Sequence, residues 1–253
     1  TGVVTFTTAG GAPATGNLVN GVATYTTADL SSGSHVVTAT YSGDDKYQLG
    51  AAAPITQTVT PAAADVQLGS LHQTYDGTPK AATATTDPIN LTVDLTYDGS
   101  ATAPTRAGSY TVVGTINEAN YAGVATDTLT IAKAGTSTSL TSSLNPSTFG
   151  ASVIFTATVG QDAGMARTAT TVDNGPTGVV TFTTADGALG TGSLADGVAT
   201  FSTAGLSGGS HLVTATYGGD DNYQGSTSTS ITQTVMHTIG VSADSAAGGA
   251  VDG

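Results

Sequence analysis

The chain has 253 residues with 5 Lys and Arg against 18 Asp and Glu, which gives a formal net charge of −13, and its pI is about 4.1. So few cations cannot displace the counterions of phosphates, which excludes a nucleic-acid binder. No apolar run approaches the roughly 18 residues that span a bilayer. Because the chain contains no Cys, disulfides, thiolate metal sites and cysteine nucleophiles are excluded as well.

The patterning predicts an all-β fold. Thr, Val and Tyr alternate in short runs such as VTFTT and HVVTATY, and these residues suit a pleated, half-solvated surface. No long segment shows the helical period with caps at its ends. We therefore expect strands along the whole chain.

An internal repeat defines the domain organisation. The segment from Thr1 aligns without gaps with the segment from Thr177, and about 40 of 59 positions are identical. Such self-similarity identifies two copies of one module. Two strand-like runs in residues 135–176 precede the second copy and have no counterpart before the first. We expect residues 1–60 to be an N-terminally truncated module and the chain to be a segment of a longer array.

The remaining elements follow in chain order. Residues 61–133 carry a different pattern of short strands separated by DG, GS and AGS turns, which predicts a small β module. Residues 134–235 hold the complete second copy, in which the stretch 161–176 is longer than we expect for a connection. Residues 236–253 predict the truncated start of a further repeat. Short linkers are expected at residues 59–64 and 132–136.

The quoted strings carry family resemblances. The repeated GVVTF, GVATF and LSxGSHxVTATY strands with their YxGDDxY corner resemble a bacterial immunoglobulin-like (Ig-like) domain. YDGTPK, APTRAGSYTV and NEANYAG in the middle module resemble the MBG-type domains of bacterial surface proteins. HTIGVSADSAAGGAVDG is similar to the opening of an internalin B-repeat. These resemblances imply tandem Ig-like β-sandwiches around a small MBG-like module, outside the cell or on its surface.

Strand parity predicts the core. Val213, Ala215 and Tyr217 share one face of their strand, and Leu212 lies on the other. By the same parity the other inward positions of the repeat are Val4, Phe6, Ala23, Tyr25, Val37, Ala39, Tyr41, Val180, Phe182, Ala199 and Phe201. His35 and His211 also have inward parity, and we interpret each as a corner residue whose ring bonds the turn backbone. A metal ligand is the alternative interpretation.

The acidic corners are the candidate metal sites. Asp44 and Asp45 in one copy, and Asp220 and Asp221 in the other, place two carboxylates side by side in a turn. Calcium prefers such oxygens but takes six to eight of them. Turn chemistry explains the same residues, because an Asp side chain can accept its own backbone N–H groups. We favour the turn, with no cofactor, and keep calcium as the alternative.

Catalysis finds no support in the sequence. A triad of Ser210, His211 and Asp220 fails because neighbouring strand residues point to opposite faces. The adjacent, duplicated carboxylates do not match the separated pair of a glycosidase. Sugar binding is disfavoured because Trp is absent and each of the nine Tyr falls at a core position or inside a motif.

These observations favour a non-catalytic stalk or spacer segment of a large adhesin-like protein, whose partners are the neighbouring Ig-like modules of the same chain. One alternative is an adhesive module for a glycan or host-matrix ligand, centred on the MBG-like domain and on the loops of residues 98–122 with Arg106 and Asn117. The other alternative is a set of accessory modules of a secreted hydrolase.

Overall fold

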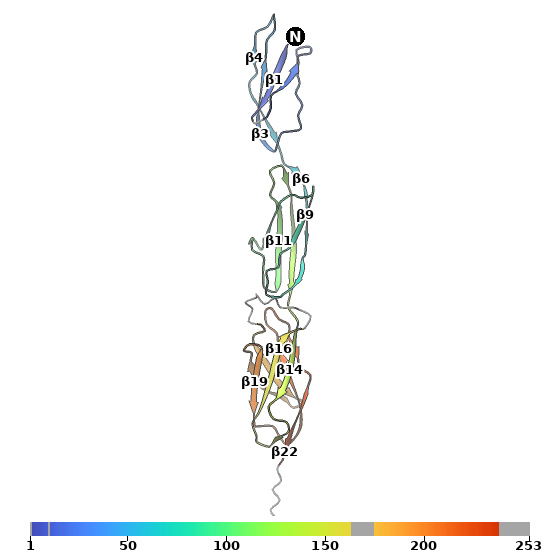
Figure 1. The fold of residues 1–253 in the computed structure, drawn as a ribbon, viewed down its shortest axis with the longest axis vertical. Helices are drawn as coiled ribbons and strands as arrows, with labels where there is room; N and C mark the ends of the chain where they lie inside the picture. Colours follow the sequence, from blue (N-terminus) through green and yellow to red (C-terminus); the bar gives the residue numbers. More distant parts are fainter. Residues whose placement is uncertain (1, 10, 163–174, 238–253) are drawn as a thin grey trace, which may run out of the picture. The chain divides into compact units, whose positions relative to one another are not determined.

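The computed structural model describes residues 2–9, 11–162 and 175–237, and these residues form β-strands and turns without a helix (Figure 1). The all-β prediction is confirmed. The expected long connection at residues 161–176 falls mostly outside the described residues, as does the expected further repeat at residues 236–253. No described segment is a helix long and apolar enough to cross a membrane.

The chain divides into two compact units. The first comprises residues 1–71, 81–103 and 110–129, and the second comprises residues 72–80, 104–109 and 130–253. The two units therefore both draw on the middle segment of the chain.

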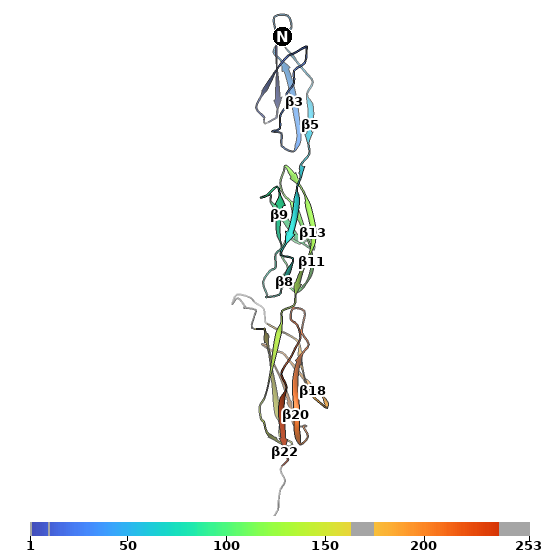
Figure 2. The same cartoon turned by 90° about the vertical axis from the view of Figure 1, so that its right-hand side faces the viewer.

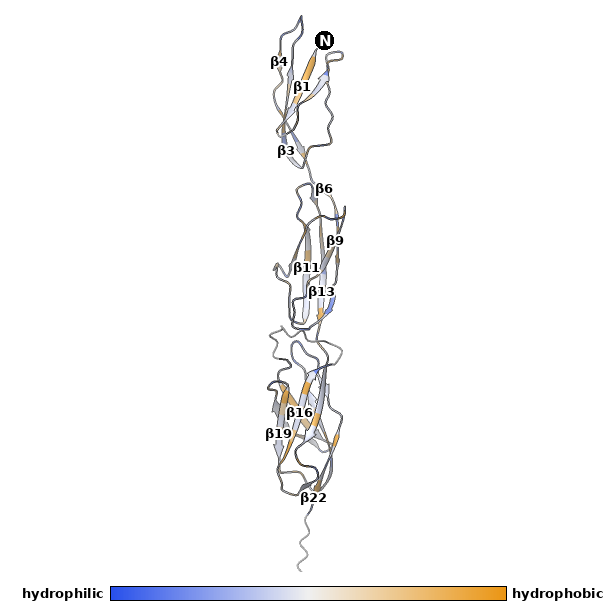
Figure 3. Ribbon diagram, viewed as in Figure 1, coloured by the Kyte–Doolittle hydropathy of each residue, from blue (hydrophilic) through white to orange (hydrophobic). Residues whose placement is uncertain are grey.

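The first Ig-like copy forms a single sheet of order β2–β1–β3–β4, with β5 also paired to β3. Its strands are β1 (Val3–Thr8), β2 (Ala14–Asn17), β3 (Gly33–Tyr41), β4 (Gly50–Ala51) and β5 (Ile55–Val59). Val and Phe residues give β1 its hydrophobic colour in Figure 3. Its side chains are only partly buried, since one layer of a sandwich cannot cover its own apolar face.

The middle segment contributes β6 (Ala62–Ala63), β7 (Asp65–Gly69), β8 (His72–Thr74), β9 (Thr83–Asp87), β10 (Val93–Tyr97), β11 (Gly108–Ile116), β12 (Tyr121–Ala122) and β13 (Val124–Ala132). The strand order of its main sheet is β10–β11–β13–β8, and β7 pairs with β9. Val112 and Leu129 are fully buried in it, and the Tyr97 hydroxyl accepts a hydrogen bond from the Ala82 amide at 2.9 Å. The predicted linker near residue 62 is itself a strand, because β6 pairs in parallel with β12.

The second Ig-like copy forms two sheets. One has the order β14–β16–β19 and the other has the order β15–β22–β20–β17–β18, with β21 paired to β20 (Figures 1 and 2). The strands are β14 (Thr136–Ser142), β15 (Ser147–Thr148), β16 (Val153–Gln161), β17 (Val179–Thr184), β18 (Gly187–Ser193), β19 (Val198–Thr203), β20 (Gly209–Tyr217), β21 (Ser226–Thr227) and β22 (Ile231–Met236).

The parity prediction is confirmed in the second copy. Val180, Phe182, Ala199, Val213, Ala215 and Tyr217 are at most 1% exposed, whereas Leu212 is 57% exposed. Phe155 of the added strand β16 packs at 6.5 Å from Phe182, which stacks at 5.8 Å on Phe201. The core therefore consists of aromatic rings contributed by both sheets.

The two copies allow a matched test of core packing. We expect Phe182→Ala to lower the free energy of unfolding of its module by about 3–5 kcal/mol, because it leaves a cavity in a closed core. The equivalent Phe6→Ala should cost clearly less, since Phe6 is only partly buried. Native-state amide exchange at β20 and β3 of the full chain measures the two modules separately. Equal losses would contradict the interpretation.

Candidate functional site

The acidic corner of the second copy is built around the Asp220 carboxylate. Its Oδ1 atom accepts the amides of Asn222 at 2.9 Å and Tyr223 at 2.8 Å. Its Oδ2 atom accepts the amide of Thr177 at 2.9 Å and the hydroxyl of the same residue at 2.8 Å. One carboxylate thus receives four hydrogen bonds from two separate segments.

The corner depends on a glycine that precedes the carboxylate. Gly219 has φ +85°, and a Cβ atom there would lie 2.8 Å from the Tyr223 carbonyl oxygen. Only glycine tolerates both the positive φ and this close approach. The GDD string is therefore explained by turn geometry, as the sequence analysis favours.

Hydrogen bonding controls the electrostatics of the corner. Burial raises the pKa of Asp220, but the bonds from Thr177, Asn222 and Tyr223 lower it more, so the pKa is below its usual value. Burial also raises the pKa of the Tyr217 hydroxyl above its usual range, and the charge of Asp220 raises it further. The corner is therefore built to hold an ionised carboxylate.

The first copy repeats the turn in a more exposed setting. The Asp44 Oδ1 atom accepts the amides of Lys46 and Tyr47, both at 2.9 Å. The bond from the Lys46 amide is the main cause that holds the pKa of Asp44 below its usual range. The second carboxylates of the two corners, Asp45 and Asp221, are exposed.

The corners offer little to a metal ion. In the part of the chain that the structure describes, no group of three or more His, Asp or Glu side chains could hold one. The inner carboxylate of each corner is also occupied by N–H donors, whereas calcium needs six to eight free oxygens. The donor set of Asp44, Asp45, Asp220 and Asp221 therefore fits a turn better than an ion.

The two histidines bond the backbone of the preceding turn. His35 Nε2 lies 2.7 Å from the Ser31 carbonyl oxygen, and His211 Nε2 lies 2.8 Å from that of Ser207. Since a carbonyl oxygen only accepts, each Nε2 carries a proton and donates it. The corner interpretation of both residues is confirmed.

Sequence reasoning missed the contacts that surround the second corner within the second unit. Tyr223 is 1% exposed, and its ring meets Tyr75 of the YDGTPK string edge-on at 5.4 Å. The Asn222 Oδ1 atom accepts the Ala107 amide at 3.1 Å. A difference between the copies was the available signal, because the equivalent of Asn222 is Lys46. The Tyr75 contact had no signal, since it depends on tertiary docking.

The predicted linker at residues 132–136 takes part in the same network. Ala134 is fully buried, donates its amide to the Asn222 carbonyl at 2.9 Å and accepts the Gln224 amide at 2.8 Å. Lys133 Nζ donates to the Asp220 carbonyl at 2.5 Å. The backbone N–H and C=O groups of Ala134 therefore both pair with the segment 222–224, as in a parallel β-bridge.

The tyrosine that closes the corner motif differs in exposure between the two copies. Tyr47 is 68% exposed, although its equivalent Tyr223 is buried. The reason is coverage, because Tyr75 and the Ala134 segment cover Tyr223, and no described residue covers Tyr47 in the same way. Arg106 belongs to the second unit and Asn117 to the first.

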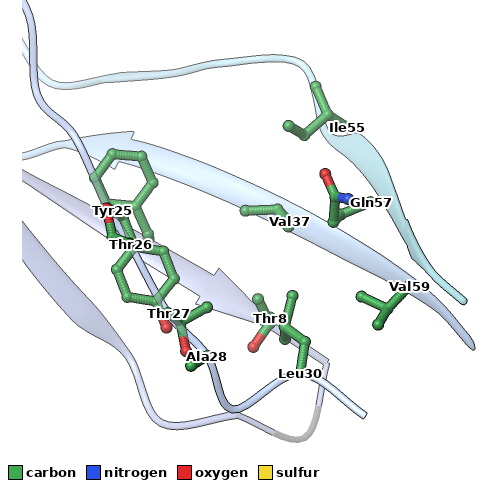
Figure 4. Close-up of a pocket in the computed structure, with 11 residues that line it drawn as sticks. Thr8, Tyr25, Thr26, Thr27, Ala28, Leu30, Val37, Ile55, Gln57 and Val59 are labelled. Carbon is green, nitrogen blue, oxygen red and sulfur yellow. The ribbon is translucent and has the colours of Figure 1, made fainter. Parts of the chain in front are cut away.

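An open hollow lies on the first copy (Figure 4). It has a volume of about 540 Å³, and its lining includes Phe6, Tyr25, Val37, Ile55, Gln57 and Val59. Phe6 and Tyr25 stack with their ring centroids 5.6 Å apart. Most of these residues are equivalents of core residues in the second copy, so the hollow is the inner face of a sandwich layer.

The described residues form layered, mostly antiparallel strands without a helix, which defines the class of the chain as one built from β-sandwich modules. Residues 1–60 and 140–236 match the model of the bacterial Ig-like domain (group 3), and residues 64–135 match that of the MBG domain. Since the Ig-like matches cover more than half of its length, the chain belongs to the bacterial Ig-like family. The resemblances stated for the Ig-like and MBG modules are confirmed.

Solved structures of low identity were also found. The fibronectin(III)-like modules of Clostridium thermocellum CbhA are 12% identical, with 68% of this chain and 93% of that one covered and a TM-score of 0.30. The Sidekick-1 immunoglobulin domains 1–5 are 12% identical, with 93% and 52% covered and a TM-score of 0.30. Domains 1–6 of the surface layer protein SbsC are 14% identical, with 94% and 35% covered and a TM-score of 0.25. No curated protein matches the chain.

The family matches indicate the broad class of function. Ig-like and MBG domains are usually non-catalytic modules, and they point to an extracellular or surface protein of bacteria.

The pKa of Asp220 yields a pH prediction. Because the folded pKa is lowered, the stabilisation is present above the ordinary carboxyl pKa of about 4 and is lost as pH falls through the folded value. At pH 7 we expect Asp220→Asn to destabilise the second module by about 1–3 kcal/mol, since it leaves donors unsatisfied. As the pH falls below the ordinary carboxyl pKa of about 4, the difference should shrink. Asp221→Asn, at an exposed position, is the matched control, and a pH-independent difference would contradict the assignment.

Calcium addition tests the alternative interpretation of the corners. We expect the unfolding midpoint of the full chain to be unchanged between chelator and about 1 mM calcium, because the inner carboxylates are already occupied by protein donors. Thermal unfolding followed by circular dichroism measures this. A rise of the midpoint that disappears in the Asp220→Asn variant would show an ion site at the second corner.

Proposed function

We propose that the chain is a non-catalytic stalk, or spacer, segment of a large bacterial cell-surface or secreted adhesin-like protein. The single observation that carries the proposal is the bonded linker around Ala134. A spacer must pass orientation from one module to the next, and a linker with free backbone groups would behave as a flexible coil. Here the N–H and C=O groups of Ala134 are both hydrogen-bonded to the segment 222–224, and the Ala134 side chain is buried.

Three side-chain contacts stabilise the region around the linker. Tyr75 and Tyr223 bring their rings together in a buried contact, Asn222 fixes the Ala107 amide, and Lys133 bonds the Asp220 carbonyl. Because these contacts join residues far apart in sequence, bending at the linker would break several of them at once. The partners that we propose are accordingly the neighbouring modules of the same chain, and we propose no cofactor.

The charge of the chain suits the same role. A net charge of −13 with only 9% charged residues leaves an acidic surface with few attractive pairs. Chains that carry such surfaces repel one another and stay soluble at high local density. This is consistent with many copies standing side by side outside the cell, which is the location that we propose.

A ligand-binding module for a glycan or host-matrix protein is the second candidate. The observation that favours it is exposed Tyr47, which lines a hollow of about 510 Å³ with Tyr41 and Gln48. A single exposed ring is a weak platform, and the hollow lies on the first copy and not on the MBG module. The spacer therefore remains the stronger proposal.

Distance measurements between spin labels test the spacer. Since the chain has no Cys, His72→Cys and Thr200→Cys give two unique labels on exposed strand positions of the second unit. We expect a narrow distance distribution, and we expect Tyr75→Ala combined with Asn222→Ala to broaden it. Asn117→Ala removes an exposed hydrogen bond to Asp94 in the first unit and serves as the control.

A broad distribution in the unaltered chain would contradict the spacer. Saturable binding of the full chain to a member of a glycan and host-matrix panel, lost in a Tyr47→Ala variant, would favour the second candidate instead.

A further inference from the structure

The turn before β3 and the turn before β20 have the same construction but differ in one residue. Their sequences are LSSGSH over residues 30–35 and LSGGSH over residues 206–211. In each turn the histidine ring bonds the carbonyl four residues earlier, at 2.7 Å in the first copy and 2.8 Å in the second. The residue after that carbonyl is Ser32 in one copy and Gly208 in the other. Because both turns are fixed in the same way, this residue determines what each turn can bind.

In the first unit Ser32 binds a turn of the middle segment. Its amide donates to the Asn120 Oδ1 atom at 2.8 Å, and its hydroxyl donates to the Ala119 carbonyl. Both acceptors belong to the NEAN turn, residues 117–120, which joins β11 to β12. The Asn120 carbonyl accepts the amide of Ala62 in β6 at 2.9 Å. Asn120 therefore bonds the turn of the first copy with its side chain and the strand that follows this copy with its backbone.

The NEAN turn is held in place before Ser32 reaches it. The Glu118 Oε1 atom accepts the Thr92 amide at 3.1 Å and the Thr92 hydroxyl at 2.7 Å. The Asn117 amide donates to the Thr92 carbonyl at 2.9 Å, and the Asn117 side chain donates to Asp94 at 2.9 Å. Since these bonds fix the turn within the middle segment, its acceptors are preorganised for a partner.

Main-chain pairing at the same place does not distinguish one partner from another. Strands β6 and β12 pair in parallel, and a Cβ atom at Gly123 would lie 2.0 Å from the Ala64 carbonyl oxygen. The two segments therefore approach closely, but every chain offers the same backbone N–H and C=O groups. The specific part of the contact is the pair of donors on Ser32.

The glycine of the second copy has a different neighbour. A Cβ atom at Gly208 would lie 3.2 Å from the Nδ1 atom of His237, which follows β22. The His237 ring stacks on Phe149 with the ring centroids 4.9 Å apart. A serine at position 208 would press against this ring pair. The second turn therefore leaves room for a ring where the first turn presents a hydroxyl.

We propose that the residue at position 32 or 208 selects the segment that docks on the end of an Ig-like copy. Ser32 selects a turn that presents a side-chain amide oxygen and a main-chain carbonyl, as residues 119–120 of the MBG domain do. A glycine at this position selects a segment that brings an aromatic ring beside it. The inference rests on the proposed spacer function, because a fixed order of modules matters only when each module orients the next.

Spin labels within the first unit test the docking of Ser32 in the full chain. Thr40→Cys and Thr115→Cys give unique labels at exposed strand positions of this unit. We expect a narrow distance distribution that Asn120→Ala broadens. Asn120→Asp retains an oxygen that accepts the Ser32 amide and should keep the distribution narrow. Exchange of the Ser32 amide should become about 2- to 10-fold faster in Asn120→Ala, because one hydrogen bond is lost.

Exchange of the residue between the copies tests the selection. Ser32→Gly introduces the residue of the second copy and should broaden the distribution. Ser31→Gly is the matched control, since it adds the same backbone freedom but removes neither donor of Ser32. Gly208→Ser should displace His237 from Phe149, which shifts the ring proton signals of His237 in nuclear magnetic resonance spectra.

Three results would overturn the inference. The first is a distribution that Ser32→Gly and Asn120→Ala leave narrow, and the second is equal broadening by Ser31→Gly and Ser32→Gly. The third is a broad distribution in the chain that carries only the labels. If the labels at positions 72 and 200 then still give a narrow distribution, this inference fails alone. Broad distributions from both label pairs would contradict the spacer as well.

Discussion

Every sandwich layer in this chain must have its apolar face covered by a second layer, and the rest of the structure depends on this constraint. The contact between Phe155 and Phe182 meets it in the second copy, where rings from the two sheets lie 6.5 Å apart. In the first copy the equivalent Phe6 stacks on Tyr25 at 5.6 Å and is only partly buried. Burial of the repeated strands is thus decided by what packs on them, because the hydrophobic gain scales with the apolar area removed from water.

The acidic corner provides the second level of organisation, since it joins segments that the sheets do not. Asp220 holds its own turn through Asn222 and Tyr223 and reaches back to Thr177. The turn positions the Tyr223 ring against Tyr75. Its backbone, at Asn222 and Gln224, bonds Ala134. A carboxylate that is fully occupied in this way is a structural element, which is why a motif that resembles a metal loop in the sequence is used here to fasten a junction.

The fold was largely predictable from the sequence, and the site only partly. Alternating Val, Phe and Tyr fixed the inward face of the second copy, because a strand has period two, and the roles of His211 and Asp220 followed from turn chemistry. The same parity could not say that Tyr47 is exposed and Tyr223 buried. These two residues occupy closely similar motifs, YSGDDKY and YGGDDNY, and their exposure differs because of the segments that pack beside them, which is information that local patterns do not contain.

A comparison of the two copies separates two causes of strand formation, the β-propensity of the residues and the pairing with a neighbouring strand. Residues 198–203 and 22–27 have almost the same β-propensity, yet only the former make a strand, because only they have β16 beside them. The β-propensity of these residues therefore describes how well their side chains pack on a pleated, half-buried surface. It does not make the backbone extend into a strand by itself. It follows that the residues needed for this strand are present in both copies, and that a paired neighbour decides whether they form one.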